Sequence, residues 1–235
     1  QLCHHFLPSP AIAGVNYTLL LAALLLLPAA YLLFLFCFMA SLTITKWVVM
    51  QGRYQEGSYS TSSFYYMRWA FVNNLLSFAR RNFVGVFKGI PVYTWWLQSM
   101  GLHLAPGAIG LALPRLHSDD ITEFDLIHIG AGAMVGEQAR VRGAVVEGGY
   151  LHLRPVFIGD HAKVGAQATL LPGAKLGEGA ELAPASVLSG RSPELPPYTM
   201  WEGSPVKMVR RLPVPKEAAA AGGVAGAGSS SSWRG

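Results

Sequence analysis

The sequence between Ile129 and Val187 repeats every six residues and decides the fold. The repeats read IGAGAM (129–134), VGEQAR (135–140), VRGAVV (141–146), IGDHAK (158–163), VGAQAT (164–169), LLPGAK (170–175), LGEGAE (176–181) and LAPASV (182–187). Every repeat opens with an aliphatic residue, and five of the eight place Gly second. The fifth residue is Ala or Ser, except in the third repeat, which has Val145.

A six-residue period fits neither an amphipathic helix nor an alternating strand. It is typical of a solenoid in which each repeat forms one short strand and one corner. The aliphatic residue then points into a narrow three-sided prism, and the small residue fits the crowded corner. Three repeats close one coil, so the sequence predicts a mainly β fold, a parallel β-helix of about three coils. The glycines at 130, 132 and 136 fall on repeat positions and lack the strand-turn-helix context of a nucleotide-binding loop.

The composition places the chain at a membrane. Of its 235 residues, 51% are hydrophobic and 13% are charged, which excludes an ordinary soluble domain. Residues 1–45 contain no Asp, Glu, Lys or Arg, whereas residues 46–100 contain six basic side chains and one acidic side chain. Anionic lipid headgroups attract such a basic segment beside an apolar one. We therefore expect membrane lipid as a partner and no nucleic acid, the other partner that a basic patch suggests.

A transmembrane anchor is predicted for residues 1–46. The sequence from Ala11 to Thr45 is almost wholly apolar. A helix over roughly residues 16–42 exceeds the about 20 residues needed to span a hydrocarbon core. A cleaved signal peptide is disfavoured because no basic segment precedes the apolar one. Because basic residues follow the helix, we expect an integral membrane protein with its β-helix domain on the cytoplasmic side.

Residues 47–100 are predicted to form a juxtamembrane link that contains an amphipathic helix, from Phe64 to Phe83. One face of this helix is polar and basic, and the rest is aromatic and aliphatic. Such a helix lies in the plane of a membrane interface. A helix packed against the prism or against other membrane helices explains the pattern equally well. A second, short helix after Pro91 is expected to cover the open end of the prism.

The β-helix domain is predicted to extend over residues 101–212. The Ala-, Gly- and Ser-rich residues 213–235 are predicted to be a disordered tail. Between Val146 and Ile158 the repeat is interrupted by an excursion that contains Glu147 and His152. Solenoid proteins commonly carry their function in excursions from the rigid scaffold, so we expect the chemistry there.

The repeats, followed by Gly203-Ser204-Pro205-Val206-Lys207, resemble the left-handed β-helix acyltransferases of the hexapeptide-repeat type. In that family a Gly-x-Pro-Ala-Lys segment lines the groove for a pantetheine arm, and Val206 replaces the Ala here. The resemblance implies a left-handed coil. It also implies that Gly203, Ser204, Pro205 and Lys207 bind coenzyme A or the phosphopantetheine of a carrier domain.

A second resemblance extends from Phe34 to Leu212. It rests on short matches that include Lys46-Trp47, Ser58-Tyr59, Arg68-Trp69, Gly89-Ile90-Pro91 and Asp125-Leu126-Ile127-His128. These matches are similar to the membrane-bound terminal region of nonribosomal peptide synthetases of the polylysine-synthetase type. In that family transmembrane helices alternate with acyltransferase-like prisms. The resemblance implies transfer of an aminoacyl group to an amine, with acyl-CoA or an acyl carrier domain as donor, and a homotrimer or sibling prisms as packing partners.

Transfer from a thioester needs a base that removes the proton of the attacking amine, a role that suits His near neutral pH. His152 is the candidate base, and Glu147 is the residue expected to orient it. The alternative for His152 is a solvated loop residue. In the resembling family a His stands three residues before the loop glutamate, where this chain has Ala144. This departure favours the alternative function, a non-catalytic scaffold or trimerisation domain.

No metal site is predicted. Carbonic anhydrases built on a β-helix bind zinc through His, but the spacing of His128, His152 and His161 does not match that family. His128 and His161 are expected to be surface residues. Lys207, with Arg210 and Arg211, is expected either to pair with the phosphates of a coenzyme or carrier arm, or to be a solvated basic stretch.

Overall fold

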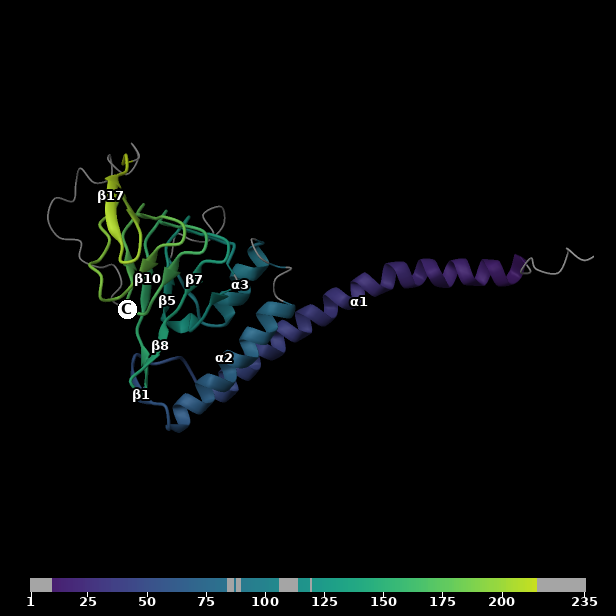
Figure 1. Cartoon of the computed structure of the whole chain (residues 1–235). Helices are drawn as coiled ribbons and strands as arrows, with labels where there is room; N and C mark the ends of the chain where they lie inside the picture. The colour runs from purple at the N-terminus through teal and green to yellow at the C-terminus, as the bar shows by residue number, and fades with distance from the viewer. Residues whose placement is uncertain (1–9, 84–86, 88–89, 106–113, 119, 215–235) are drawn as a thin grey trace, which may run out of the picture. The chain divides into compact units, whose positions relative to one another are not determined.

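The computed structural model describes residues 10–83, 87, 90–105, 114–118 and 120–214, with the backbone alone for residues 10–21 (Figure 1). It divides into two compact units, Gln1–Thr45 and Lys46–Gly235. The predicted disordered tail lies outside the described residues from residue 215 onward.

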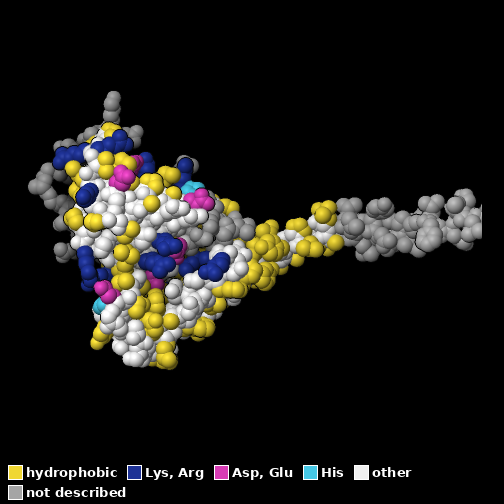
Figure 2. Space-filling model, in the orientation of Figure 1, with side chains coloured by type: hydrophobic (Ala, Val, Ile, Leu, Met, Phe, Trp, Pro, Cys, Tyr) yellow, Lys and Arg dark blue, Asp and Glu magenta, His cyan; other side chains and the backbone are white. Residues whose placement is uncertain are grey.

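The apolar N-terminal sequence forms one long helix, α1 (Pro10–Met50). Its segment Ala22–Met50 has 29 residues and a mean hydropathy of 2.4, which is long and apolar enough to cross a membrane. The helix contains Pro28 and extends at both ends beyond the residues predicted for it. Apolar side chains cover the exposed surface of its described part (Figure 2).

The six-residue repeats form the predicted parallel β-helix, a prism with three sheets. The first sheet contains β2 (His103–Leu104), β5 (Ile127–Ile129), β10 (Val156–Ile158) and β13 (Lys175–Leu176). The second contains β3 (Arg115–Leu116), β6 (Met134–Val135), β11 (Lys163–Val164), β14 (Glu181–Leu182), β16 (Thr199–Glu202) and β17 (Lys207–Arg211). The third contains β4 (Asp120–Ile121), β7 (Arg140–Val141), β12 (Thr169–Leu170) and β15 (Val187–Leu188). The chain passes through the three sheets in turn, and only β17 pairs antiparallel within them.

The repeat positions have the burial that the sequence predicts. The first residue of every repeat is buried, from Ile129 to Leu182. Each such aliphatic side chain contributes about 1.5–3 kcal/mol on burial. The fifth position is buried wherever it is Ala or Ser, but Val145 is 37% exposed. The reason is that the third repeat leaves the coil after Val141 and continues into a different strand, β8 (Ala144–Glu147).

The glycines at the second repeat position are required by the spacing between coils. A Cβ at Gly165 would lie 2.5 Å from the backbone nitrogen of Pro184 in the next coil, and a Cβ at Gly130 would lie 2.4 Å from that of Asp160. Real Cβ atoms do not approach backbone this closely, so another residue at either position forces the coils apart.

The described residues form four coils, one more than predicted. The additional coil is the first, in which β2, β3 and β4 pair in parallel with β5, β6 and β7. Its strands are separated by segments of irregular length, so no six-residue period marks it in the sequence. A short 3₁₀ helix, Phe124–Leu126, leads from this coil into the second.

The helix predicted at Phe64 to Phe83 is α2 (Phe64–Asn82). The Ser63 hydroxyl caps its first turn by accepting a hydrogen bond of 3.2 Å from the Tyr66 backbone N–H. Its buried side chains are Trp69, Val72, Leu76, Ala79 and Arg80. Two of them bond to the first coil, because the Trp69 indole donates to Glu123 and Arg80 donates to the Ile121 carbonyl. One face of α2 therefore packs against the prism. This is the second of the two arrangements that the sequence left open, the first being a helix in the membrane interface.

The short helix predicted after Pro91 is α3 (Pro91–Ser99). Tyr93 and Leu97 are fully buried, and the Tyr93 hydroxyl donates a hydrogen bond of 3.1 Å to the Ser118 carbonyl in the first coil. The Trp96 ring contacts the Phe124 ring edge-on, with 6.4 Å between centroids. The predicted short helix thus covers the first coil.

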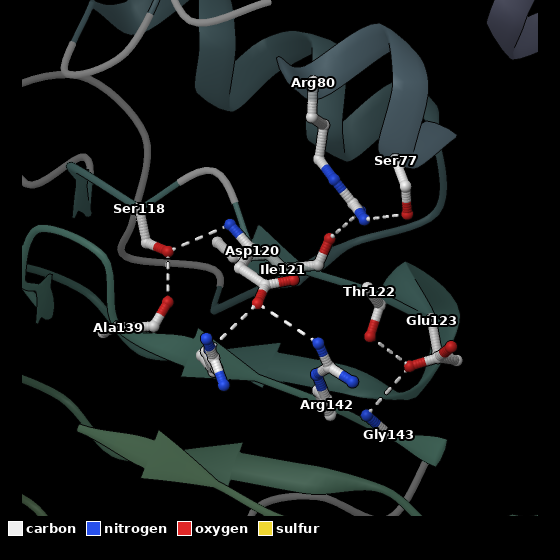
Figure 3. Close-up of polar contacts among 11 residues, drawn as sticks. Ser77, Arg80, Ser118, Asp120, Ile121, Thr122, Glu123, Ala139, Arg142 and Gly143 are labelled. Carbon is white, nitrogen blue, oxygen red and sulfur yellow. Dashed lines mark hydrogen bonds and ion pairs between the residues drawn. The ribbon is translucent and has the colours of Figure 1, made fainter. Parts of the chain in front are cut away.

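A buried carboxylate, Glu123, holds the first two coils and α2 together, and Figure 3 shows its bonds to Thr122 and Gly143. One carboxylate oxygen accepts the Trp69 indole N–H at 3.0 Å. The other accepts the Thr122 hydroxyl and, at 3.1 Å, the backbone N–H of Gly143. Burial raises the pKa of Glu123, while these hydrogen bonds oppose the rise. Gly143 directly precedes β8, so Glu123 fixes the point at which the excursion leaves the prism.

A buried ion pair joins Lys46 to Asp125. The Lys46 ammonium lies 2.6 Å from the Asp125 carboxylate, and the two side chains are 0% and 1% exposed. The same carboxylate oxygen accepts the Tyr54 backbone N–H at 3.1 Å. A Cβ at Gly101 would lie 1.9 Å from the other carboxylate oxygen, so only Gly fits beside the pair. The pair brings together parts of the prism unit that are 79 residues apart in the chain.

We predict that Lys46→Met lowers the free energy of unfolding by about 3–5 kcal/mol, because Asp125 is then left as an unpaired buried charge. The matched control is Lys163→Met, which breaks a pair of the same 2.6 Å length between side chains that are 57% and 25% exposed. Its cost is expected to be below about 1 kcal/mol. Denaturant unfolding of the full chain in detergent measures both. Equal costs for the two substitutions would contradict the prediction.

Candidate active site

The excursion begins within the third repeat and folds into a β-hairpin at the corner between the third and first sheets. It consists of β8 and β9 (Tyr150–Leu153), which pair antiparallel around a turn at Gly148-Gly149. Both turn residues have positive φ, as a two-residue hairpin turn requires. A third strand, β1 (Gly57–Ser60), pairs antiparallel with the free edge of β9. This third strand comes from the link that precedes α2.

His152 lies in the middle strand of this small sheet. Its direct neighbours across the sheet are Val145 on β8 and Ser58 on β1. The Ser58 hydroxyl oxygen and the His152 Nδ1 are 2.7 Å apart, and the tautomer of the ring decides which of them donates. The Tyr150 ring lies on the same face of β9, with 6.4 Å between its centroid and that of His152.

His152 and Glu147 line one cavity, which we call the hairpin pocket. Its volume is about 270 Å³, and its lining residues are Val145, Glu147, His152, Arg154, Leu171, Pro172, Ser189 and Arg191. The structure thus places both excursion residues named from the sequence, Glu147 and His152, on the same cavity. Their predicted contact is different, because the Glu147 carboxylate pairs with Arg191 at 3.5 Å and His152 bonds to Ser58.

The residues implied for pantetheine binding lie at another corner of the prism. Gly203, Ser204 and Pro205 form the turn between β16 and β17, and Lys207 begins β17. The Gly203 backbone N–H donates to the Ser186 hydroxyl at 3.0 Å, and its carbonyl accepts the Val187 backbone N–H at 3.1 Å. These bonds stack the turn on the corner between the second and third sheets.

A groove runs along that corner, and we call it the second-sheet groove. Its volume is about 270 Å³, and its lining residues are His117, Met134, Val135, Gly136, Lys163, Val164, Gly165, Glu181, Leu182, Ala183, Pro184 and Met200. Met134, Lys163, Glu181 and Met200 are successive partners across four strands. The next partner is Arg210 of β17, whose five residues are all exposed. The groove therefore ends beside a strand with three cationic side chains.

None of the residues from Gly203 to Lys207 lines the hairpin pocket. The pocket and this turn lie at the two ends of the third-sheet strands, since Ser186 precedes β15 at one corner and Ser189 follows it at the other. The sequence predicted both parts but gave no indication that they occupy separate corners.

His128 and His161 lie outside both cavities. His128 is half-buried in a column of stacked rings on the first sheet, 4.6 Å from His103 and 4.7 Å from Phe157 between centroids. Burial and the nearby His103 lower the pKa of His128 to about 4. His161 is exposed at a corner with left-handed backbone. Among the described residues, no three His, Cys, Asp or Glu side chains form a group that would hold a metal ion.

We predict that His128 destabilises the fold in mild acid. Its unfolded form binds a proton below a pH of about 6.5, whereas the folded form stays neutral down to a pH of about 4. Stability is therefore fully present above the unfolded pKa and falls as pH drops through this window. His128→Phe, which keeps a stacked ring, should reduce the loss of melting temperature between pH 7.5 and pH 5. His161→Asn is the control and should leave that loss unchanged; an unchanged loss in His128→Phe would contradict the prediction.

Two residues of this region were not predicted as parts of a site. Ser58 lies 94 residues before His152, in a segment with no repeat pattern. Arg191 follows the last repeat and meets Glu147 only because the coils stack. Neither contact leaves a local signal in the sequence.

Comparison with known proteins gives distant similarities. No family model matches this chain. It is 24% identical over 170 residues to the delta-poly-L-ornithine synthetase of Acinetobacter baumannii, an alignment that covers 72% of this chain and 12% of that protein. It is 33% identical over 64 residues to a Staphylococcus aureus protein named "Putative acetyltransferase SAV2555", covering 27% of this chain and 31% of that protein. The chain thus spans only a small part of the length of either relative.

Comparison with solved structures finds distant matches over about two thirds or more of this chain. A maltose O-acetyltransferase from Clostridium difficile 630 covers 72% of this chain and 97% of its own, with a TM-score of 0.48 and 14% identity. A galactoside acetyltransferase in complex with coenzyme A covers 67% of this chain and 88% of its own, with a TM-score of 0.45 and 11% identity. Since both TM-scores are below 0.5, the fold assignment rests on the repeats and on the strand pairing described above.

Proposed function

We propose that this chain is a membrane-anchored acyl- or aminoacyltransferase-type unit of a nonribosomal-peptide-synthetase-like protein. Its donor is a pantetheine thioester, either of coenzyme A or of a carrier domain, and its coil is left-handed. The observation that carries the proposal is the hairpin pocket. There a histidine has one ring nitrogen bonded to Ser58 and no hydrogen bond to the other nitrogen from any residue that the structure describes. The similarity to the polyornithine synthetase supports the context.

The second-sheet groove has the apolar lining that suits a pantetheine arm. It is long and mostly apolar, and it runs across successive strands toward the turn that contains Gly203. At its end β17 presents Lys207, Arg210 and Arg211, all exposed, with no ion pair to the described carboxylates. Guanidinium and ammonium groups of this kind pair with phosphates. The thioester supplies an activated acyl group at the far end of such an arm.

The chain's own contribution to the reaction is a proton acceptor. In the proposed step the amine nitrogen of the acceptor attacks the thioester carbonyl carbon, and the His152 Nε2 takes a proton from that amine. The carbon–sulfur bond then breaks, and the same proton passes to the departing sulfur, so the products are an amide and a free thiol. Positioned general-base catalysis of this kind contributes typically about 10²–10⁴-fold.

The separation of the hairpin pocket from the Gly203 turn bears on the assembly. If both act in one reaction, either the arm crosses the third sheet or a second prism contributes one of the two parts. We propose the second arrangement, in a homotrimer or between sibling prisms of one polypeptide, because the prism has flat outer faces that suit side-by-side packing.

We predict that His152→Gln lowers the turnover number for transfer from acetyl-CoA or an aminoacyl carrier domain to a primary amine by about 10²–10⁴-fold. The Michaelis constant for the donor should remain within about twofold, since His152 lies outside the second-sheet groove. His161→Gln, at an exposed corner, is the matched control and should retain full activity. Activity retained in His152→Gln would remove the proposed base.

The second candidate function is a silent scaffold, and Ala144 is the observation that favours it. Ala144 begins β8 opposite Leu153 and does not line the hairpin pocket. If catalysis requires a histidine at position 144, Ala144→His gains activity and His152→Gln changes nothing. If His152 is the base, Ala144→His gives no gain.

We propose that α1 spans the membrane with the prism on its cytoplasmic side, and that α2 touches the same membrane. Four large side chains of α2 are exposed by 56–68%: Phe64, Met67, Phe71 and Phe78. Their spacing of three, four and seven residues places them on one stripe, roughly opposite the buried face that packs on the prism. Arg81, also exposed, flanks this stripe. Such an apolar stripe with a flanking cation suits a lipid interface.

A spin label tests this contact. We predict that a label at Phe71→Cys, in a chain with Cys3 and Cys37 replaced by Ala, is more accessible to oxygen than to a water-soluble nickel complex. The chain is reconstituted in vesicles of phosphatidylcholine and phosphatidylglycerol. A label at Glu137→Cys, an exposed corner of the prism, is the control and should show the opposite preference. Nickel accessibility at residue 71 equal to that at residue 137 would rule the contact out.

A further inference from the structure

The strand β1 reaches the candidate active site from outside the repeats. It lies between α1 and α2 in the chain, yet all four of its residues pair with β9, from Gly57 opposite Leu153 to Ser60 opposite Tyr150. This register places Ser58 directly across from His152. In an antiparallel pair, directly opposite side chains lie on the same face and close together. The backbone pairing therefore holds Ser58 beside the imidazole without help from any other side chain.

The direction of the bond between the two residues corresponds to one tautomer of the imidazole or the other. A neutral imidazole carries one N–H, and the partner of one nitrogen determines the state of the other. When Nδ1–H donates to the Ser58 oxygen across their 2.7 Å separation, Nε2 keeps its lone pair. When the Ser58 hydroxyl donates instead, Nε2 carries the proton and cannot accept another. Only the first arrangement gives a base at Nε2.

The other polar groups of the hairpin pocket do not compete for Nδ1. Glu147 pairs with Arg191, and Arg154, which also lines the pocket, makes no hydrogen bond to the His152 ring among the described residues. On β1 the next hydroxyl on the same face, that of Ser60, bonds to the Ser62 hydroxyl at 2.8 Å. Ser58 is the one described residue with a hydrogen bond to the His152 ring.

We propose that Ser58 is a positioning residue, which accepts the Nδ1–H of His152 and keeps Nε2 free toward the hairpin pocket. This inference rests on the proposed function, in which His152 is the base. Ser58 has the role of orienting His152 that was predicted for Glu147 from the sequence. The link between α1 and the prism thus completes the site, so the catalytic histidine depends on a segment outside the β-helix.

The contact is solvent-exposed, so it contributes little to stability, and its loss is expected to leave the fold intact. Ser58→Ala should therefore keep the melting temperature of the full chain within about 2 °C. Ser58→Thr retains the hydroxyl on a residue that suits a strand. Ser60→Ala is the matched control, because it removes a neighbouring hydroxyl on the same strand without touching His152.

The experiment is nitrogen-15 NMR of the full chain in detergent micelles, labelled at histidine, with the His152 signals assigned by their loss in His152→Gln. We expect the Nδ1-protonated tautomer in the wild type, in Ser58→Thr and in Ser60→Ala, and a shift toward the Nε2-protonated tautomer in Ser58→Ala. The Nε2-protonated tautomer in the wild type, or an unchanged tautomer in Ser58→Ala, would overturn the proposal.

A parallel transfer assay separates this inference from the proposed function. Ser58→Ala should lower the turnover number about tenfold, the effect of one lost hydrogen bond. The Michaelis constant should be unchanged, and Ser58→Thr should restore the rate. If the wild type transfers no acyl group but shows the Ser58-dependent tautomer, the proposed function fails while the contact stands. If it is active and Ser58→Ala is equally active, the positioning role fails alone.

Discussion

Successive coils of this protein approach so closely at several corner glycines, among them Gly130 and Gly165, that no Cβ fits there. At Gly165 the added atom would lie 2.5 Å from the next coil's backbone, and at Gly130 it would lie 2.4 Å away. This close approach accompanies the ordinary spacing of paired strands, and on each of the three sheets the aliphatic first positions align in one column. Since the coils cannot separate locally, an insertion must leave the prism entirely. The β8–β9 hairpin does so at the corner that follows Val141, within the third repeat.

The first coil lacks the repeat pattern and is held instead by buried polar contacts. Glu123 bonds to Trp69 on α2 and to the backbone at Gly143, where the hairpin begins. Asp125 bonds to Lys46 and to the Tyr54 backbone. These two carboxylates fasten the preceding link and α2 to the prism. The same link supplies β1 to the hairpin, so the position of His152 depends on both the coil and the residues that precede it.

The repeats made most of the prism predictable. Its core positions, α2, α3 and the excursion with Glu147 and His152 all follow from short-range patterns. The first coil was missed because its three strands, from His103 to Ile121, have no common spacing. The exposure of Val145 was not predicted, because the six-residue pattern around it does not indicate that the chain leaves the coil after Val141. Ser58 bonds to His152 across 94 residues of sequence, and Asp125 bonds to Lys46 across 79. Contacts between residues so far apart leave no periodic signal in the sequence. Glu147 was assigned the role of orienting His152 from sequence proximity alone, whereas strand register brings Ser58 to the ring.

We propose that the prism binds a pantetheine thioester along the second-sheet groove and its terminal turn. Calorimetric titration of the full chain in detergent with coenzyme A tests it most directly, with Lys207→Ala as the variant and Lys175→Ala, an exposed lysine of the first sheet, as the control. We expect micromolar binding to the wild type and to Lys175→Ala, and binding about tenfold weaker in Lys207→Ala, the effect of one lost charge-assisted contact. Repeating the titration with a pantetheinyl carrier protein extends the test to the second donor. Failure of both ligands to bind the wild type would exclude a pantetheine site in this prism and favour the silent scaffold.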